Sequence, residues 1–126
     1  MIRVLRAEAL EDGRDQRRHD RYVIEMPGVL RLDGARGVFL VTVLDLSKSG
    51  LRFRSSRTFP AGARVEVKCG DKRIFGVVRY AREVGHEFNV GVEADRVEAP
   101  NGAVVAGDDL DLTAIFPIES KRPRAS

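Results

Sequence analysis

Two short segments of the chain, GLRFRSS and ARVEVKC, alternate apolar with charged residues. In the first segment Leu51 and Phe53 alternate with Arg52 and Arg54. Successive side chains of a strand point to opposite faces, so a period of two is typical of an antiparallel strand with one buried face. Helix-period patterns are scarce in the rest of the chain. The sequence therefore predicts an all-β fold.

The central part of the chain divides into six expected strands separated by turn residues. Turn chemistry occurs at Asp33-Gly34, Pro60-Ala61-Gly62 and Gly70-Asp71, where glycine and proline supply the backbone angles that tight turns need. Short connections favour a meander of neighbouring antiparallel strands, and closure into a six-stranded antiparallel β-barrel would remove exposed edges. The expected strands are residues 22–32, 36–46, 50–56, 63–70, 72–82 and 86–94.

With 126 residues, the chain has the length of one compact domain with tails. Residues 2–11 are compatible with a short helix, and residues 109–118 with a short strand or one helical turn packed on the barrel. Residues 120–126 are typical of a disordered basic tail. The expected organisation is an N-terminal extension, a barrel domain that includes a flexible arginine-rich entry segment, and a short C-terminal extension: residues 1–13, 14–95 and 96–126.

Composition restricts the compartment and the class of partner. No apolar run reaches the length of a membrane helix, about 18 residues, and the N-terminus lacks the apolar core of a secretory signal. Cys69 is the one cysteine, which is compatible with a reducing compartment. We therefore expect a cytoplasmic protein without membrane insertion. The net charge is +3, and residues 22–94 carry +4. An anionic partner is plausible, whereas so small a net charge gives little support to general nucleic-acid binding.

Two polar segments are candidates for a binding site, and each also has an ordinary interpretation. DLSKSG, residues 45–50, has the composition of a hairpin turn in which Gly50 adopts a backbone conformation that other residues resist. QRRHDRY, residues 16–22, reads as a solvated basic segment. However, Asp45 would stand at the rim of the barrel, where a carboxylate accepts two hydrogen bonds from a planar group with adjacent N–H donors. The planar guanidinium of arginine can in turn form paired hydrogen bonds with a phosphate and stack on an aromatic ring.

The two segments together form a recognisable pair. QRRHDRY contains R-x-x-x-R as Arg17 and Arg21, and DLSKSG contains D-x-S-x-x-G as Asp45, Ser47 and Gly50. In this order, with strands between them, they resemble the PilZ domain family of bacterial receptors for the second messenger cyclic di-GMP. The likeness covers residues 14–95, because FNVGVEA resembles the closing strand of the family. It departs from the family at Ala94, where an aromatic residue is common.

The resemblance implies a six-stranded barrel with a divided, nucleotide-binding site. Arg17 and Arg21, with Arg18 as a secondary candidate, would hold the phosphates and guanine edges of cyclic di-GMP. Asp45 would accept hydrogen bonds from the guanine N1–H and amine, and Ser47 would bond near the base or phosphate. Gly50 would let the backbone approach closely. Ligand would order the arginine segment and change a surface read by an unidentified effector protein.

Other function classes have less support. The two histidines and Cys69 lack the spacing of a zinc site, no histidine stands near Ser47 as a base, and no phosphate loop is present. We therefore expect a protein that is not an enzyme and has neither metal nor cofactor. One alternative is a barrel that binds RNA or single-stranded DNA, but aromatic stacking platforms are few. Another is an adaptor of the same fold that contacts proteins without ligand. The basic residues considered for nucleic acid are Arg52, Arg54, Arg64, Lys72 and Arg73.

Overall fold

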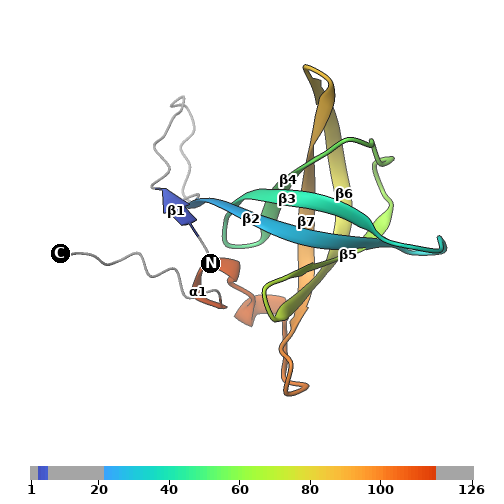
Figure 1. Cartoon of the computed structure of the whole chain (residues 1–126). Helices are drawn as coiled ribbons and strands as arrows, with labels where there is room; N and C mark the ends of the chain where they lie inside the picture. Colours follow the sequence, from blue (N-terminus) through green and yellow to red (C-terminus); the bar gives the residue numbers. More distant parts are fainter. Residues whose placement is uncertain (1–2, 6–21, 116–126) are drawn as a thin grey trace.

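The computed structural model of the protein describes residues 3–5 and 22–115, and Figure 1 gives their arrangement. These residues form eight strands and two short helical turns. In chain order they are β1 (Arg3–Leu5), β2 (Tyr22–Leu32), β3 (Phe39–Leu46), β4 (Gly50–Ser55), β5 (Arg64–Cys69), β6 (Lys72–Val84), β7 (Glu87–Glu98), β8 (Val104–Ala106), the 3₁₀ turn η1 (Gly107–Asp109) and α1 (Leu112–Ile115).

Strands β2 to β7 close into a six-stranded antiparallel barrel, which confirms the predicted fold class. The hydrogen-bonded order is β2-β3-β4-β7-β6-β5, and β5 pairs back onto β2. The expected meander is wrong at one point, because β4 pairs with β7 and not with β5. Closure leaves no open edge around the wall of the barrel, whereas the tip of the β6–β7 hairpin extends beyond it (Figure 1).

The connection between β4 and β5 lies at the departure from a meander and is anchored in the core. Residues 56–63 carry Phe59 into the core, where its side chain is 4% exposed. Its ring makes edge-to-face contacts with Phe53, at 5.9 Å between centroids, and with Phe39, at 5.5 Å. This aromatic anchor holds the connection against the barrel where the chain passes from β4 to β5, which pairs with β2.

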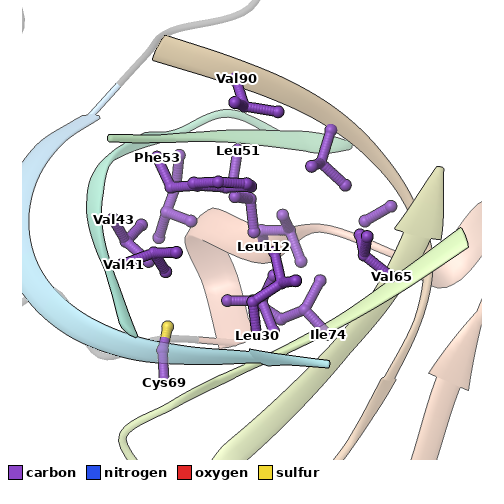
Figure 2. Close-up of a cluster of buried hydrophobic side chains, with 14 of the residues drawn as sticks. Leu30, Val41, Val43, Leu51, Phe53, Val65, Cys69, Ile74, Val90 and Leu112 are labelled. Atoms are coloured by element: carbon purple, nitrogen blue, oxygen red, sulfur yellow. The ribbon is translucent and has the colours of Figure 1, made fainter. Parts of the chain in front are cut away.

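The core confirms the alternation seen in the sequence. In β4, Leu51 and Phe53 are buried while Arg52 and Arg54 remain partly exposed. The side chains inside the barrel are mostly valine, leucine, isoleucine and phenylalanine (Figure 2). The β-branched and aromatic residues among them suit a pleated, half-buried surface.

The two ends of the described chain add to this barrel. Arg3–Leu5 forms a strand that pairs with β2, so the helix expected for residues 2–11 is wrong over these residues, and residues 6–11 lie outside the described part of the chain. At the other end, β8 pairs with β7, and α1 is the helical turn that was one of two alternatives for this segment. Leu110 and Leu112 pack into the core at 5% and 0% exposure. The expected basic tail also lies outside the described residues.

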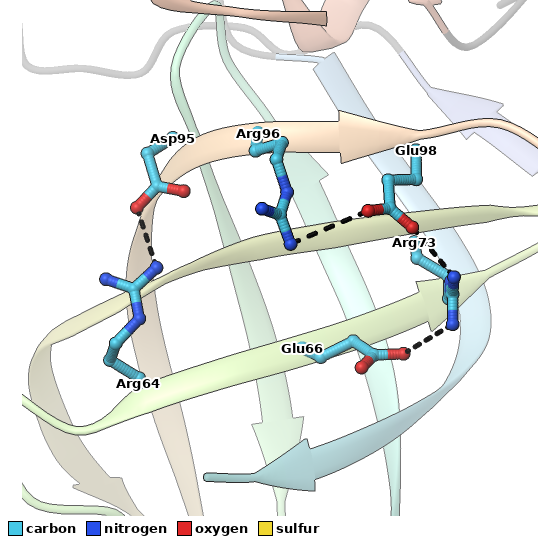
Figure 3. Close-up of polar contacts among 6 residues, drawn as sticks. All are labelled: Arg64, Glu66, Arg73, Asp95, Arg96 and Glu98. Atoms are coloured by element: carbon cyan, nitrogen blue, oxygen red, sulfur yellow. Dashed lines mark hydrogen bonds and ion pairs between the residues drawn. The ribbon is translucent and has the colours of Figure 1, made fainter. Parts of the chain in front are cut away.

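The outer wall formed by β5, β6 and β7 carries a network of ion pairs (Figure 3). Arg73 contacts Glu98 at 2.7 Å and Glu66 at 3.8 Å, and Arg96 reaches Glu98 at 3.6 Å. The guanidinium of Arg96 also stacks over the ring of Phe75, 4.0 Å from its centroid. Positive charge on this wall is thus largely balanced by carboxylates within the same sheet.

Candidate functional site

The β3–β4 hairpin carries the three candidate residues of the barrel: Asp45 in β3, Ser47 in the turn and Gly50 at the start of β4. Ser47 N–H donates to the carbonyl of Gly50 at 2.8 Å, which closes a tight hairpin turn. The Ser47 hydroxyl lies 3.4 Å from the same carbonyl oxygen. Ser47 and Gly50 are therefore held together by local structure, and Asp45 lies two residues before Ser47 in β3. Their role in ligand binding stays a prediction.

Gly50 is needed for space and not for an unusual backbone angle. It is absent from the glycines with positive φ in the described residues, so the expectation of a conformation that other residues resist is wrong. A Cβ at this position would lie 3.0 Å from the backbone oxygen of Val92, tighter than side chains normally tolerate. The hydrogen of glycine lets β4 run close to β7 at the point where the turn ends.

Two further backbone bonds hold the tip of the turn. The carbonyl of Lys48 accepts from Leu112 N–H at 2.9 Å, and the carbonyl of Ser49 accepts from Ala94 N–H at 2.8 Å. The first bond comes from the segment that packs Leu112 into the core, and the second from strand β7. Because bonds arrive from two separate elements, the turn is a fixed part of the barrel surface.

Asp45 is buried, with 2% of its side chain exposed. Arg52 Nε donates to Asp45 Oδ2 at 2.9 Å, and Arg52 Nη2 donates to the same oxygen. The hydrogen bond to Asp45, opposed by partial burial, raises the pKa of Arg52 above its ordinary value, so its charge is permanent. The carboxylate predicted to meet a ligand thus lies beneath an arginine that the sequence motifs do not include.

The strand register places these residues in one row across four strands. Asp45 lies opposite Arg52, Arg52 opposite Gly91, and Gly91 opposite Tyr80. The ring of Tyr80 covers Gly91, because a Cβ on Gly91 would lie 2.3 Å from Tyr80 Cε2. Tyr80 is 41% exposed and lines the same pocket as Arg52, and the guanidinium of Arg82 stands over its ring, 5.9 Å from the centroid.

A shallow pocket of about 90 Å³ lies at this row. Arg79 stands at its edge and pairs with Glu93 at 3.1 Å. The pocket combines fixed hydroxyl and backbone groups with arginine and an aromatic ring, the chemistry that recognises a phosphate or a base edge. Its lining residues are Ser47, Gly50, Leu51, Arg52, Arg79, Tyr80, Gly91 and Val92.

The motifs alone missed Arg52, Arg79 and Tyr80 as members of this surface. Arg52 was considered only for nucleic-acid binding, and Tyr80 carried no signal because its position depends on the β6–β7 register. The predicted site residues Arg17, Arg18 and Arg21 lie outside the described residues.

A larger concavity of about 500 Å³ lies elsewhere, on the β2–β3 and β5 surface. Its lining is mostly apolar side chains and glycines, with Thr42 and a single charged group, Lys68. This chemistry suits an anionic ligand less well than the arginine-flanked pocket. Over residues 3–5 and 22–115, no group of three or more histidine, cysteine, aspartate or glutamate side chains could hold a metal ion. In the same part of the chain, no helix has the length and apolarity needed to cross a membrane.

The described residues thus form a closed six-stranded barrel with a small recess on its wall, lined in part by arginine, serine and tyrosine. The family model of the PilZ domain matches residues 15–106, and the chain belongs to the PilZ domain family. PilZ domains are generally cyclic di-GMP-binding domains and are typically non-catalytic receptors. A search of curated proteins found no match.

Proposed function

We propose that the protein is a receptor for cyclic di-GMP. The observation that carries the proposal is the pocket in which Ser47 and Gly50 of the D-x-S-x-x-G turn meet Arg52 and Tyr80 on a PilZ barrel. Guanine stacks on Tyr80, while the fixed turn and the arginines offer donors to its edge or to a phosphate.

The size of the pocket supports a divided site. Pockets that enclose a small ligand measure about 300–1,000 Å³, whereas this one measures about 90 Å³. The barrel therefore supplies one wall, and the arginine segment supplies the other through Arg17, Arg21 and, secondarily, Arg18. Two phosphates neutralise these arginines, and the ordered segment becomes the surface that an effector protein reads.

Calorimetry with cyclic di-GMP on the full chain tests the proposal. We expect a dissociation constant in the micromolar range or tighter, because several charge-assisted contacts exceed the cost of ordering the segment. Arg21→Ala or Asp45→Ala should weaken binding by about 1.5–3 kcal/mol each, the range for hydrogen bonds to charged groups. Arg31→Ala, which removes an exposed charge from β2, is the matched control. An absence of heat at high micromolar ligand would refute the proposal.

The nucleic-acid alternative is not favoured by the outer wall. Each basic side chain on which it depends lies within 4.0 Å of a carboxylate, so little positive charge is left for a polyanion. These residues are Arg52, Arg54, Arg64, Lys72 and Arg73. Steeply salt-dependent binding of polynucleotide, without binding of the cyclic dinucleotide, would reverse this preference. The ligand-independent adaptor is distinguished by the same calorimetry.

A further inference from the structure

The larger concavity lies on the half of the barrel away from the arginine-flanked pocket. The hydrogen-bonded order β2-β3-β4-β7-β6-β5, closed by β5 on β2, places β3, β2 and β5 side by side and β4, β7 and β6 on the other half. The concavity on the β3–β2–β5 wall measures about 500 Å³, within the about 300–1,000 Å³ of pockets that take up a ligand. The barrel therefore has two separate recesses on its wall.

The concavity lies where β2 changes its partner strand. β3 pairs with one edge of β2, and on the other edge β5 pairs as far as Gly28 while β1 pairs beside Glu25. Met26 and Pro27 lie between these two partners, and Pro27 and Gly28 line the concavity. The recess is thus a consequence of the strand pairing.

The side chains that face outward around the concavity are largely apolar. Leu40 is 78% exposed, and Val38, two residues earlier in the chain, is 46% exposed. Val29 of β2 lies opposite Leu40 of β3 and opposite Lys68 of β5, so the three residues form one row across three strands. A single exposed leucine is ordinary on a protein surface, whereas apolar side chains gathered at a concavity are typical of an interaction site.

The cations beside this apolar row have no carboxylate partner. Lys68 is the one charged residue that lines the concavity, and Arg31 lies on the same face of β2 as Val29, two residues further along. Among the residues that the structure describes, neither cation forms an ion pair. Glu66, opposite Arg31 in the register, contacts Arg73 at 3.8 Å instead. Exposed cations without partners favour an acidic ligand.

We propose that the surface formed by Val29, Leu40 and Lys68, with Arg31 beside it, is a docking site for a protein segment that carries a large apolar side chain next to acidic residues. The apolar side chain fills the concavity beside Leu40, and the carboxylates pair with Lys68 and Arg31. This contact is separate from the recess and the arginine segment of the proposed function, and it does not require cyclic di-GMP.

Two other occupants fit the surface less well. A two-fold contact between copies of the chain would bring Lys68 and Arg31 of one copy close to the same unpaired cations of the other, which is unfavourable. Anionic membranes are typically bound by clusters of about four to eight basic residues, whereas this concavity is lined by one.

The test is a nuclear magnetic resonance titration of the isotope-labelled full-length protein, without nucleotide, with a synthetic peptide in which aspartate and glutamate flank a Leu-Phe pair. We expect saturable shift changes at the backbone amides of Val29, Leu40 and Lys68. Two control peptides should each bind at least about 10-fold more weakly. One carries lysines around the same Leu-Phe pair, and the other carries Ser-Ser between the same acidic residues.

Substitutions on the surface complete the test. Leu40→Asp should weaken binding of the acidic peptide about 10-fold or more, the range for losing the burial of a leucine side chain; if this variant does not fold, Leu40→Ala takes its place. Lys68→Glu should weaken binding most at low salt and less as salt is added. Val104→Asp is the matched control, because Val104 is 53% exposed on β8, outside the concavity. It should leave the affinity unchanged.

Equal binding of the three peptides, or shift changes confined to other parts of the barrel, would overturn the inference. Dimerisation that Leu40→Asp abolishes would assign the surface to a second copy, and Leu40-dependent binding to vesicles of phosphatidylcholine and phosphatidylglycerol would assign it to a membrane. Nuclear Overhauser contacts from Leu40 to another segment of the same chain would assign it to that segment. Because the titration contains no nucleotide, a failure to bind cyclic di-GMP would overturn the proposed function alone.

Discussion

Gly91 has no side chain, and the ring of Tyr80 occupies the space that a Cβ at this position would need. The three atoms nearest to a Cβ built on Gly91 all belong to the Tyr80 ring, at 2.3, 2.5 and 2.9 Å. Gly91→Ala should therefore displace the ring and cost about 1–2 kcal/mol of unfolding free energy, in the range for overpacking. It should also weaken cyclic di-GMP binding, because the aromatic face moves. Urea denaturation and calorimetry measure the two effects.

The control for this prediction is the same substitution without the ring. In a Tyr80→Ala background, Gly91→Ala should have almost no effect on unfolding free energy, because the atoms that oppose it are gone. An equal cost in both backgrounds would show that the backbone of β7, and not Tyr80, requires glycine.

Cys69 is a buried thiol whose titration affects stability at high pH. It is 1% exposed, and burial raises its pKa from 9.0 to about 12. Between these values the unfolded chain releases a proton that the folded chain keeps, so the stabilisation present below pH 9 is lost as pH rises. The unfolding free energy should fall by about 1.4 kcal/mol per pH unit from this group. Denaturation of wild type and Cys69→Ala between pH 8 and pH 10.5 measures it; parallel profiles would contradict the assignment.

The connection between β4 and β5 carries a buried aromatic anchor. Because Phe59 anchors it against Phe39 and Phe53, Phe59→Ala should reduce the unfolding free energy by about 3–5 kcal/mol, the cost of an emptied aromatic site. Thr58→Ala, at an exposed neighbour, should change it by less than about 0.5 kcal/mol. Chemical denaturation checks both. A small loss at position 59 would mean that strand pairing alone keeps β5 beside β2.

Strand positions were predictable from the sequence because alternation is local. The predicted and observed strands agree within a few residues, and 22–32 agrees at both ends with Tyr22–Leu32. The pairing of the strands was harder to predict from the sequence, because it depends on contacts between residues that are far apart in the chain. Phe59 stands in a connection of loop-like composition, SRTFPAGA, and nothing nearby indicates that its ring enters the core.

The candidate site likewise has residues that a local motif names and residues that only strand pairing brings together. Asp45, Ser47 and Gly50 lie within one six-residue segment, so a short motif is enough to name them as candidates. Arg52 and Tyr80 meet only through register, which shifts at bulges between Val43 and Asp45 in β3 and between Val78 and Tyr80 in β6. A bulge moves later side chains to a new partner, and single-sequence periodicity contains no information on such shifts.

The C-terminal segment links the core to the turn between β3 and β4. Leu112 is fully buried among the strand side chains (Figure 2), and its N–H binds the carbonyl of Lys48 at 2.9 Å. One residue thus contributes to the stability of the whole barrel and to the position of the turn. The family match ends at residue 106, although the packing continues through Leu110 and Leu112.

The substitution of leucine by alanine can be compared at a buried position, Leu112→Ala, and at an exposed position, Leu40→Ala. The difference between them reports the burial of Leu112 and not the substitution as such. Leu112 is 0% exposed and Leu40 is 78% exposed. Leu112→Ala should lower the unfolding free energy by about 2–5 kcal/mol, whereas Leu40→Ala should change it by less than about 0.5 kcal/mol. Because the Lys48 carbonyl keeps its backbone partner only while the segment stays docked, Leu112→Ala should also weaken cyclic di-GMP binding at temperatures where the barrel remains folded. Thermal unfolding measures the loss of stability, and calorimetry at low temperature measures the affinity. Normal affinity in a destabilised Leu112→Ala protein would show that the turn keeps its shape without the C-terminal segment.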